Sequence, residues 1–313
     1  MSQTPFLFLG CAIHKASFIR VLLLYLFPLL IASASPLCAQ LPFYTDDPAV
    51  TEAGVLHFEF FNEYDGLQSS EFPDLRQNTA NFKVNYGLKH NLELDLDFPY
   101  LSIYRAPGSP SSAGYGDTDL GIKWNFHRAS PGSWVPALGA SFYAEFPTGD
   151  SHNGLGSGLT DYWLNCIAQK PFTPKTRMNV NLGFLFAGNT STGAIGIQTT
   201  RGHVFTGGLS LLHDFTPRLT LGIEAYGGVA DTSGLGHTQL QGLLGGTFAI
   251  RNGLNFSFGL LGGKYEASPR IGGQIGFSMD FPTVFRRSSD TETAVATSTK
   301  NILESTATRR SFP

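Results

Sequence analysis

Acidic residues stand at alternate positions of several short segments in which the positions between them are apolar. In the segment LELDLDF, residues 92–98, three carboxylates alternate with four large apolar side chains. Alternate residues of an extended strand point to the same face, so the carboxylates of each such segment share one face. Rings of carboxylates attract cations and repel anions, which is the chemistry of a cation-selective pore. The full set consists of Glu59, Glu93, Asp95, Asp97, Asp117, Asp119, Glu145, Asp161, Glu224 and Asp280, with Lys83 and Lys123 as its clearest cationic neighbours.

Two interpretations of this polar set remain open at the level of the sequence. In the first, the side chains line a water-filled pore and give it a preference for cations. In the second, they form a salt-bridged and hydrogen-bonded plug that keeps a narrow barrel rigid. Reversing the charges of Glu93, Asp95 and Asp97 distinguishes the two, because only an open pore would then invert its ion selectivity.

Catalytic and metal-binding chemistry is poorly represented in the sequence. Asp117 and Asp119 would lie about 7 Å apart on one strand face, which suits a pair of acid and base carboxylates, but among other reactive residue types only His127 stands near them. The histidines lack the spacing of a helical zinc site, and no nucleophile-elbow motif occurs. We therefore predict no catalytic residue, no metal site and no cofactor. An outer-membrane hydrolase is kept as the less favoured alternative class.

The elements that position the polar set are predicted to be long β-strands. From residue 54 onward the hydrophobic period is two and not 3.6. Most of these segments run 11–14 residues, which exceeds the ~5–6 of a soluble strand and reaches the ~9–11 of a strand that crosses a bilayer. The twelve predicted strands lie near residues 54–64, 77–87, 90–101, 116–127, 135–147, 158–170, 176–187, 202–213, 218–230, 237–250, 253–263 and 270–281.

The connections between these strands alternate in length. Compact turns separate the long ones, and the turn FTPK at residues 172–175 recurs as FTPR at residues 215–218. Short turns on one rim and long loops on the other are typical of transmembrane β-barrels. We therefore predict an all-β fold, a closed up-and-down antiparallel barrel of about twelve strands, with apolar side chains facing lipid and the polar set facing the lumen. The long loops are predicted at residues 65–76, 102–115, 148–157, 188–201 and 231–236.

The two ends of the chain differ from the barrel in composition. Residues 1–39 have the basic start, short apolar run and small residues of a secretory signal peptide, with cleavage after Ala34 or Ala39. A lipidated Cys38 and an uncleaved membrane anchor are the alternatives at this end. We expect a periplasmic N-terminal segment over residues 40–53, the barrel over 54–281 and a disordered polar tail over 282–313.

Three patches of the sequence resemble a known family. They are LPFYTDDP at residues 41–48, GDTDLGIKWNF at 116–126, and FPTGD at 146–150 with the glycine-rich run 154–158 behind it. They are similar to the TDDP start, the GD-x-x-L-x-x-K-aromatic strand and the PTGD segment of the family named "Putative MetA-pathway of phenol degradation". The resemblance covers most of residues 41–281. It implies a transporter-like outer-membrane barrel, and the family name suggests passage of aromatic hydrocarbons.

Composition and resemblance together predict a channel or transporter of the bacterial outer membrane. Its function would be passive passage of small solutes, hydrophobic or aromatic compounds among them. The main alternative is a non-conducting barrel with a structural or surface-interaction role. Expected partners are outer-membrane lipid, a small-molecule solute and the outer-membrane insertion machinery. The net charge of −3 and the absence of a basic cluster argue against nucleic acid.

Overall fold

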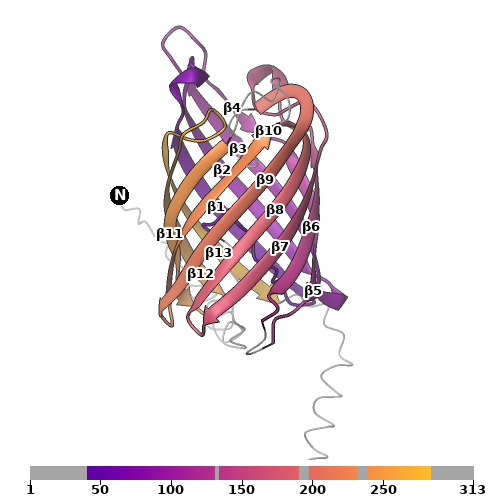
Figure 1. The fold of residues 1–313 in the computed structure, drawn as a ribbon. Coiled ribbons are helices and arrows are strands. Elements are labelled where there is room, and N and C mark those ends of the chain that lie inside the picture. The colour runs from indigo at the N-terminus through magenta and orange to yellow at the C-terminus, as the bar shows by residue number, and fades with distance from the viewer. Residues whose placement is uncertain (1–40, 131–133, 190–196, 231–238, 283–313) are drawn as a thin grey trace, which may run out of the picture.

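The computed structural model describes residues 41–130, 134–189, 197–230 and 239–282, and twelve long strands in these ranges form one closed antiparallel barrel (Figure 1). The predicted fold is therefore confirmed. The signal peptide predicted at residues 1–39 and the tail from residue 283 lie outside the described residues. Within the described part of the chain, no helix is both long enough and apolar enough to cross a membrane.

The barrel strands follow one another around the ring in chain order. Three single 3₁₀ turns lie between them, at Ser69–Glu71, Lys89–Asn91 and Ser151–Asn153. The strands are β1 (Val55–Gly66), β2 (Asp74–Gly87), β3 (Leu92–Arg105), β5 (Thr118–His127), β6 (Ala137–Phe146), β7 (Asp161–Thr173), β8 (Thr176–Asn189), β9 (Ile197–Thr216), β10 (Leu219–Ala230), β11 (Gln239–Arg251), β12 (Leu254–Gly263) and β13 (Ile271–Pro282), with the short β4 (Ser112–Tyr115) beside β3.

Pairing of the first strand with the last closes the barrel. Phe60 of β1 lies opposite Phe82 of β2 on one side and opposite Phe277 of β13 on the other. The remaining strands pair with their neighbours in sequence, so the ring has no open edge. Closure is what a membrane demands of a sheet, because an unpaired edge in hydrocarbon would leave backbone polar groups without partners.

One predicted strand, near residues 116–127, is in fact the second part of a longer interrupted strand. β4 and β5 both pair with β3, β4 with its second half and β5 with its first. Tyr115 lies opposite Tyr100 while Asp119 lies opposite Asp97, so four steps along one chain match three along the other. The extra residue makes a bulge at Gly116 and Asp117, and bulges of this kind redirect a side chain.

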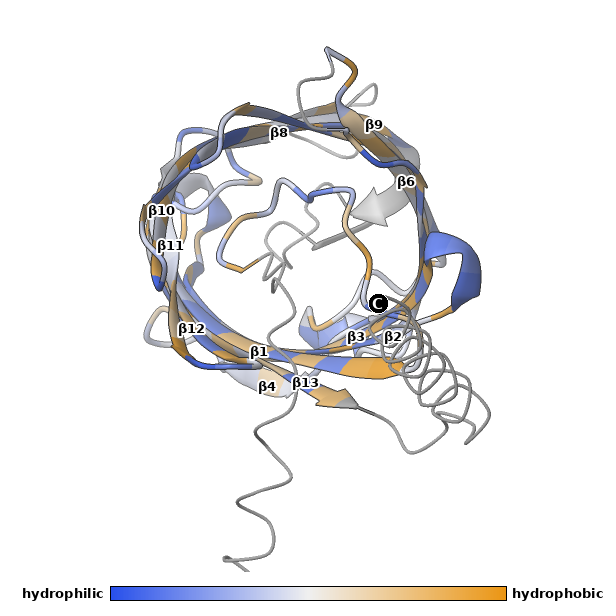
Figure 2. Ribbon diagram, turned by 90° about the horizontal axis from the view of Figure 1, so that it is seen from below, coloured by the Kyte–Doolittle hydropathy of each residue, from blue (hydrophilic) through white to orange (hydrophobic). Residues whose placement is uncertain are grey.

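The two faces of each strand have the polarity that the period of two predicts. In β5, Trp124 is 50% exposed whereas the neighbouring Lys123 is 1% exposed. Leu120, Ile122 and Phe126 share the outward face of Trp124. Figure 2 looks along the barrel and shows hydrophilic and hydrophobic residues alternating around the ring. The outer surface is therefore an apolar belt suited to lipid, and the polar side chains lie inside.

The connections confirm the predicted asymmetry between the two rims. At one end β7–β8, β9–β10 and β11–β12 are joined by turns of two residues, at 174–175, 217–218 and 252–253. The connections at the opposite end are longer, and the one between β6 and β7 runs from residue 147 to 160. Figure 1 shows the tilted strands with the tight turns gathered at the lower end.

The segment before β1 lies inside the barrel. Its residues bond to side chains on opposite walls, Tyr44 to Glu63 of β1 and Thr45 to Glu224 of β10. Figure 2 shows chain passing within the ring of strands. We call residues 41–51 the inner segment. Residues 40–53 were expected in the periplasm, and their described part instead lies in the lumen, because carboxylates there accept its backbone N–H groups and apolar side chains cover its Phe43.

An arginine at the middle of the apolar belt should destabilise the barrel more than one at its rim. Ile122→Arg in the middle of β5 should cost about 2–4 kcal/mol of unfolding free energy, because the guanidinium would face hydrocarbon. Ile250→Arg, next to the turn at 252–253, is the matched control and should cost about 0–1 kcal/mol. Urea unfolding of the protein refolded in lipid vesicles measures both. Equal costs at the two depths would contradict the lipid-facing assignment.

Candidate functional site

Pairing of the strands brings six of the predicted polar residues into one row. Each lies directly opposite the next on adjacent strands, where Cβ atoms stand about 4.5–5.5 Å apart. The sequence placed these side chains on inner faces, whereas their alignment depends on the register of five strand pairs. This row, which we call the acidic row, runs through Glu59, Lys83, Asp97, Asp119, Glu145 and Asp161 on β1, β2, β3, β5, β6 and β7.

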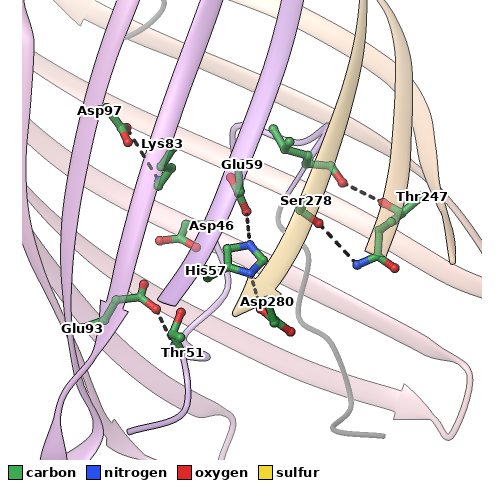
Figure 3. A network of polar contacts seen from close by, with 12 residues as sticks. Asp46, Thr51, His57, Glu59, Lys83, Glu93, Asp97, Thr247, Ser278 and Asp280 are labelled. Atoms are coloured by element: carbon green, nitrogen blue, oxygen red, sulfur yellow. Dashed lines mark hydrogen bonds and ion pairs between the residues drawn. The ribbon is translucent and has the colours of Figure 1, made fainter. Parts of the chain in front are cut away.

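The first part of the acidic row is neutralised by nearby cationic side chains. His57 Nε2 lies 2.9 Å from Glu59 Oε1, and His57 Nδ1 lies 2.5 Å from Asp280 Oδ1 across the β1–β13 seam. Lys83 Nζ stands 3.8 Å from Asp97 Oδ2. Figure 3 shows these side chains side by side on the inner wall. No histidine spacing in the sequence marks His57 for this role.

Three other members of the predicted set hold the inner segment. Glu93 accepts a hydrogen bond from the backbone N–H of Thr51 at 2.5 Å (Figure 3). Glu224 accepts from the backbone N–H groups of Thr45 and, at 3.1 Å, of Tyr44. Lys123 Nζ donates to Asp46 Oδ1 at 2.8 Å. Hydrogen bonds to an ionised partner are stronger than neutral ones, so these contacts fix the inner segment against walls on different sides of the lumen.

Burial shifts the pKa values of two ionisable side chains of the inner segment, Asp46 and Tyr44. Burial raises the pKa of the Asp46 carboxyl to about 6, and the Lys123 ammonium opposes this rise. Asp46 is therefore largely ionised at neutral pH, and its contact with Lys123 is an ion pair. Burial and the neighbouring carboxylates of Glu63 and Asp65 raise the pKa of the Tyr44 hydroxyl well above its ordinary value, so it remains a donor to Glu63.

Asp117 holds a loop that folds inward between β6 and β7. Its Oδ1 accepts from the backbone N–H of Gly149 at 2.9 Å, and its Oδ2 accepts from that of Ser157 at 2.6 Å. Leu155 of the same loop is buried against Leu101 and Ile103 of β3. The bulge at Gly116 and Asp117 thus directs the Asp117 carboxylate toward the glycine-rich loop. Asp117 holds this loop in place rather than forming a free part of a pore wall.

Asp95, the last member of the set, bonds to an aromatic side chain. Tyr143 donates its hydroxyl to Asp95 Oδ2 at 2.7 Å, reaching from β6 across β5. Gly121 on β5 makes this reach possible, since a Cβ at that position would collide with the Tyr143 ring. Neither Tyr143 nor Trp163, which lies opposite it on β7, was identified from the sequence. Both stand at inward positions of their strands, and this alternation is the one signal in the sequence that could have identified them.

A cavity of about 200 Å³ lies between the acidic row, the inner segment and the β6–β7 loop. Its lining is mixed: it includes carboxylates of the acidic row and apolar side chains, among them Leu41 and Phe43 of the inner segment, Leu155 and Leu185. Some of the predicted polar set therefore line this cavity, whereas Glu93, Glu224 and Lys123 hold the inner segment. Neither interpretation of the set is decided by this arrangement. A role in ion selectivity stays a prediction for all of them.

Metal binding and catalysis find no further support in the lumen. Across the described ranges, no group of three His, Cys, Asp or Glu side chains is arranged to hold a metal ion. Asp117, one half of the carboxylate pair considered for catalysis, is already engaged by the two backbone N–H groups of the loop. The arrangement favours binding and electrostatic selection of a solute over a reaction.

Comparison with known proteins decides the family. The family model described as "Putative MetA-pathway of phenol degradation" matches residues 77–265. The chain belongs to this family. The resemblance expected from the three sequence patches is thereby confirmed, and the matched residues of this family member extend from β2 to beyond β12.

Solved structures similar to this family member are outer-membrane barrels. An outer membrane channel from Pseudomonas putida F1 is 14% identical with a TM-score of 0.58, over 75% of this chain and 98% of that chain. The KdgM porin is 10% identical with a TM-score of 0.48, over 72% and 99%. The CymD monoaromatic hydrocarbon channel is 8% identical with a TM-score of 0.39, over 74% and 89%. No curated protein matches the sequence. At these identities the likeness concerns the fold alone.

Removing the cation that faces Asp46 should loosen the inner segment. Lys123→Met leaves the Asp46 carboxylate buried without its partner, which costs about 3–5 kcal/mol when a buried pair is broken from one side. Backbone amides of residues 41–51 should then exchange with deuterium faster, while amides of β9 to β12 keep their rates. Mass spectrometry of peptic fragments measures this.

The matched control restores neutrality at the same place. Lys123→Met combined with Asp46→Leu removes both charges and should return the exchange of residues 41–51 most of the way to the native rate. If the single and double variants exchange alike, the ion pair does not hold the segment.

Proposed function

We propose that this protein is a passive channel of the bacterial outer membrane for small solutes, with apolar and aromatic compounds among those it admits. The observation that carries the proposal is the cavity inside the closed barrel, which ionisable and apolar side chains both line. An apolar belt around the barrel suits it to a lipid surround, and passive passage requires neither a cofactor nor a reaction. The family description, with its phenol pathway, supports aromatic compounds as the solute class.

The charge of the cavity supports a preference for cations over anions. Asp97, Asp119 and Glu145 face the cavity beside a single ammonium, Lys83, among the residues that line it. A narrow, partly desolvated space strengthens the field of each carboxylate. An anion passing this place would meet like charges, whereas a cation would exchange part of its hydration shell for carboxylate oxygens.

The main alternative is a non-conducting barrel, and the inner segment is the observation that favours it. Residues 41–51 take up part of the lumen and are fixed to several walls. A barrel filled in this way would serve as a rigid support for its loops. The presence or absence of conductance separates the two functions.

Single-channel recording of the refolded mature chain in a planar bilayer tests the channel. Under a salt gradient we expect discrete current steps with a cation-selective reversal potential. Asp97→Asn, Asp119→Asn and Glu145→Gln together should move that potential toward zero, because they remove the carboxylates that face the cavity. Glu52→Gln, an exposed acid before β1, is the control and should leave it unchanged. A folded barrel without current would favour the non-conducting alternative.

Deletion of residues 41–48 should raise the conductance severalfold, because these residues occupy part of the lumen between the cavity and the β10–β12 wall. The same recordings measure it, and the barrel's resistance to unheated detergent on a gel confirms its folding. A barrel that stays closed after this deletion would mean that the inner segment is not what limits current. The channel proposal would then depend on the β6–β7 loop held by Asp117.

A further inference from the structure

Two members of the acidic row that line the cavity, Asp119 and Glu145, form no ion pair with a cationic side chain in the described part of the chain. By contrast, Glu59 has His57 and Asp97 has Lys83. These two carboxylates lie directly opposite each other on β5 and β6. Two adjacent carboxylates in a space of low dielectric repel each other strongly, and a cation between them would relieve that repulsion.

Two uncharged polar side chains in the lining of the same cavity also lack partners. Ser141 on β6 and Asn165 on β7 lie opposite each other, line the cavity and are only 2% and 4% exposed. Ser141 Oγ and Asn165 Oδ1 have no hydrogen-bond partner among the described residues. Buried polar atoms are normally satisfied, so these two oxygen atoms are available to accept hydrogen bonds from a ligand in the cavity.

Aromatic rings complete the surroundings of the carboxylates. Tyr143 and Trp163 line the cavity with ring centroids 6.2 Å apart and planes inclined at 40°. Lys83 Nζ stands 6.0 Å from the Tyr143 ring centroid, so this ring already has one cation as a neighbour. Ring faces attract ammonium groups, and the attraction grows when the site excludes water. Gly183 keeps this corner open, because a Cβ there would press against Trp163 Nε1.

The chemistry of this corner matches an organic cation better than a metal ion. A hard metal ion requires six or more oxygen ligands around one point, whereas here carboxylates stand beside aromatic rings and the apolar Leu155 and Leu185. The volume of about 200 Å³ is below the ~300–1,000 Å³ of pockets for drug-sized ligands, so the ligand is small. Carboxylates suit its charge, and rings and leucines suit its carbon body.

We propose that the cavity binds a small organic cation, a protonated amine or quaternary ammonium with an apolar group. Its charged nitrogen lies against Asp119 and Glu145, with Tyr143 and Trp163 around it, and its apolar group contacts Leu155 and Leu185. This site deepens the proposed channel function, on which its role in transport rests, by naming one class of solute that the lumen selects. The occupancy of the site is nevertheless an equilibrium property that can be measured without any flux.

Equilibrium binding to the refolded mature chain in detergent tests the site. Isothermal titration compares benzyltrimethylammonium with two controls of similar shape, neutral benzyl alcohol and anionic benzoate. We expect the cation to bind at least about tenfold more tightly than the alcohol, and benzoate not to bind. Equal affinities for cation and alcohol would overturn the proposal.

Variants place the binding in the proposed corner. Asp119→Asn with Glu145→Gln should weaken benzyltrimethylammonium binding at least about tenfold, since the carboxylates that face its charge are gone. Trp163→Leu should weaken the binding of benzyltrimethylammonium severalfold and that of tetramethylammonium less. Glu52→Gln should change neither. Resistance to unheated detergent on a gel confirms that each variant is folded. Unchanged affinity in a folded Asp119→Asn, Glu145→Gln barrel would overturn the site.

The outcomes separate the site from the channel. Cation binding without conductance would retain the site and reject passage. Conductance without preferential cation binding would reject the site and leave the channel as proposed.

Discussion

Closure of the sheet is the constraint on which the rest of this structure depends. Strands that cross a bilayer must satisfy every backbone N–H and C=O within the protein, and pairing of β1 with β13 removes the last free edge. Once the ring is closed, the register between neighbouring strands cannot slip without turning the apolar face inward. The acidic row is a direct consequence, because the fixed register places Glu59, Lys83 and Asp97 side by side on adjacent strands.

A closed barrel with ionisable side chains inside must solvate or pair them, and this one does both. The inner segment supplies backbone N–H groups to Glu93 and Glu224 and a carboxylate to Lys123. The β6–β7 loop supplies two further N–H groups to Asp117. A buried charge without a partner would cost free energy, and here the backbone N–H groups and side chains of these two segments supply the partners. The same contacts hold the inner segment and the β6–β7 loop inside the lumen. Asp119 and Glu145, which line the cavity, form no such bond to the inner segment or the β6–β7 loop among the described contacts.

The lumen is consequently asymmetric. Its β1–β7 side carries the acidic row, and the inner segment packs its Phe43 against Leu212, Leu243 and Leu261 on β9, β11 and β12. A solute in the cavity would meet carboxylates and apolar side chains, since both line it. Such a lining discriminates by charge and admits carbon groups at the same time, which a uniformly polar pore does not do. The proposed selection of organic cations rests on this mixed lining.

The sequence by itself determined the fold class, a strand number of about twelve and the inward face of the strands that alternate clearly, such as the one containing residues 92–98. It also placed twelve charged residues on the polar faces of their strands. It could not show which of them meet, because pairing register is a property of two strands and leaves no mark in either. It could not place the inner segment, whose nonperiodic residues bond to walls 19 and 180 residues away in the chain. Nor could it mark His57 or Trp163, whose roles depend on neighbours that only the closed barrel brings beside them.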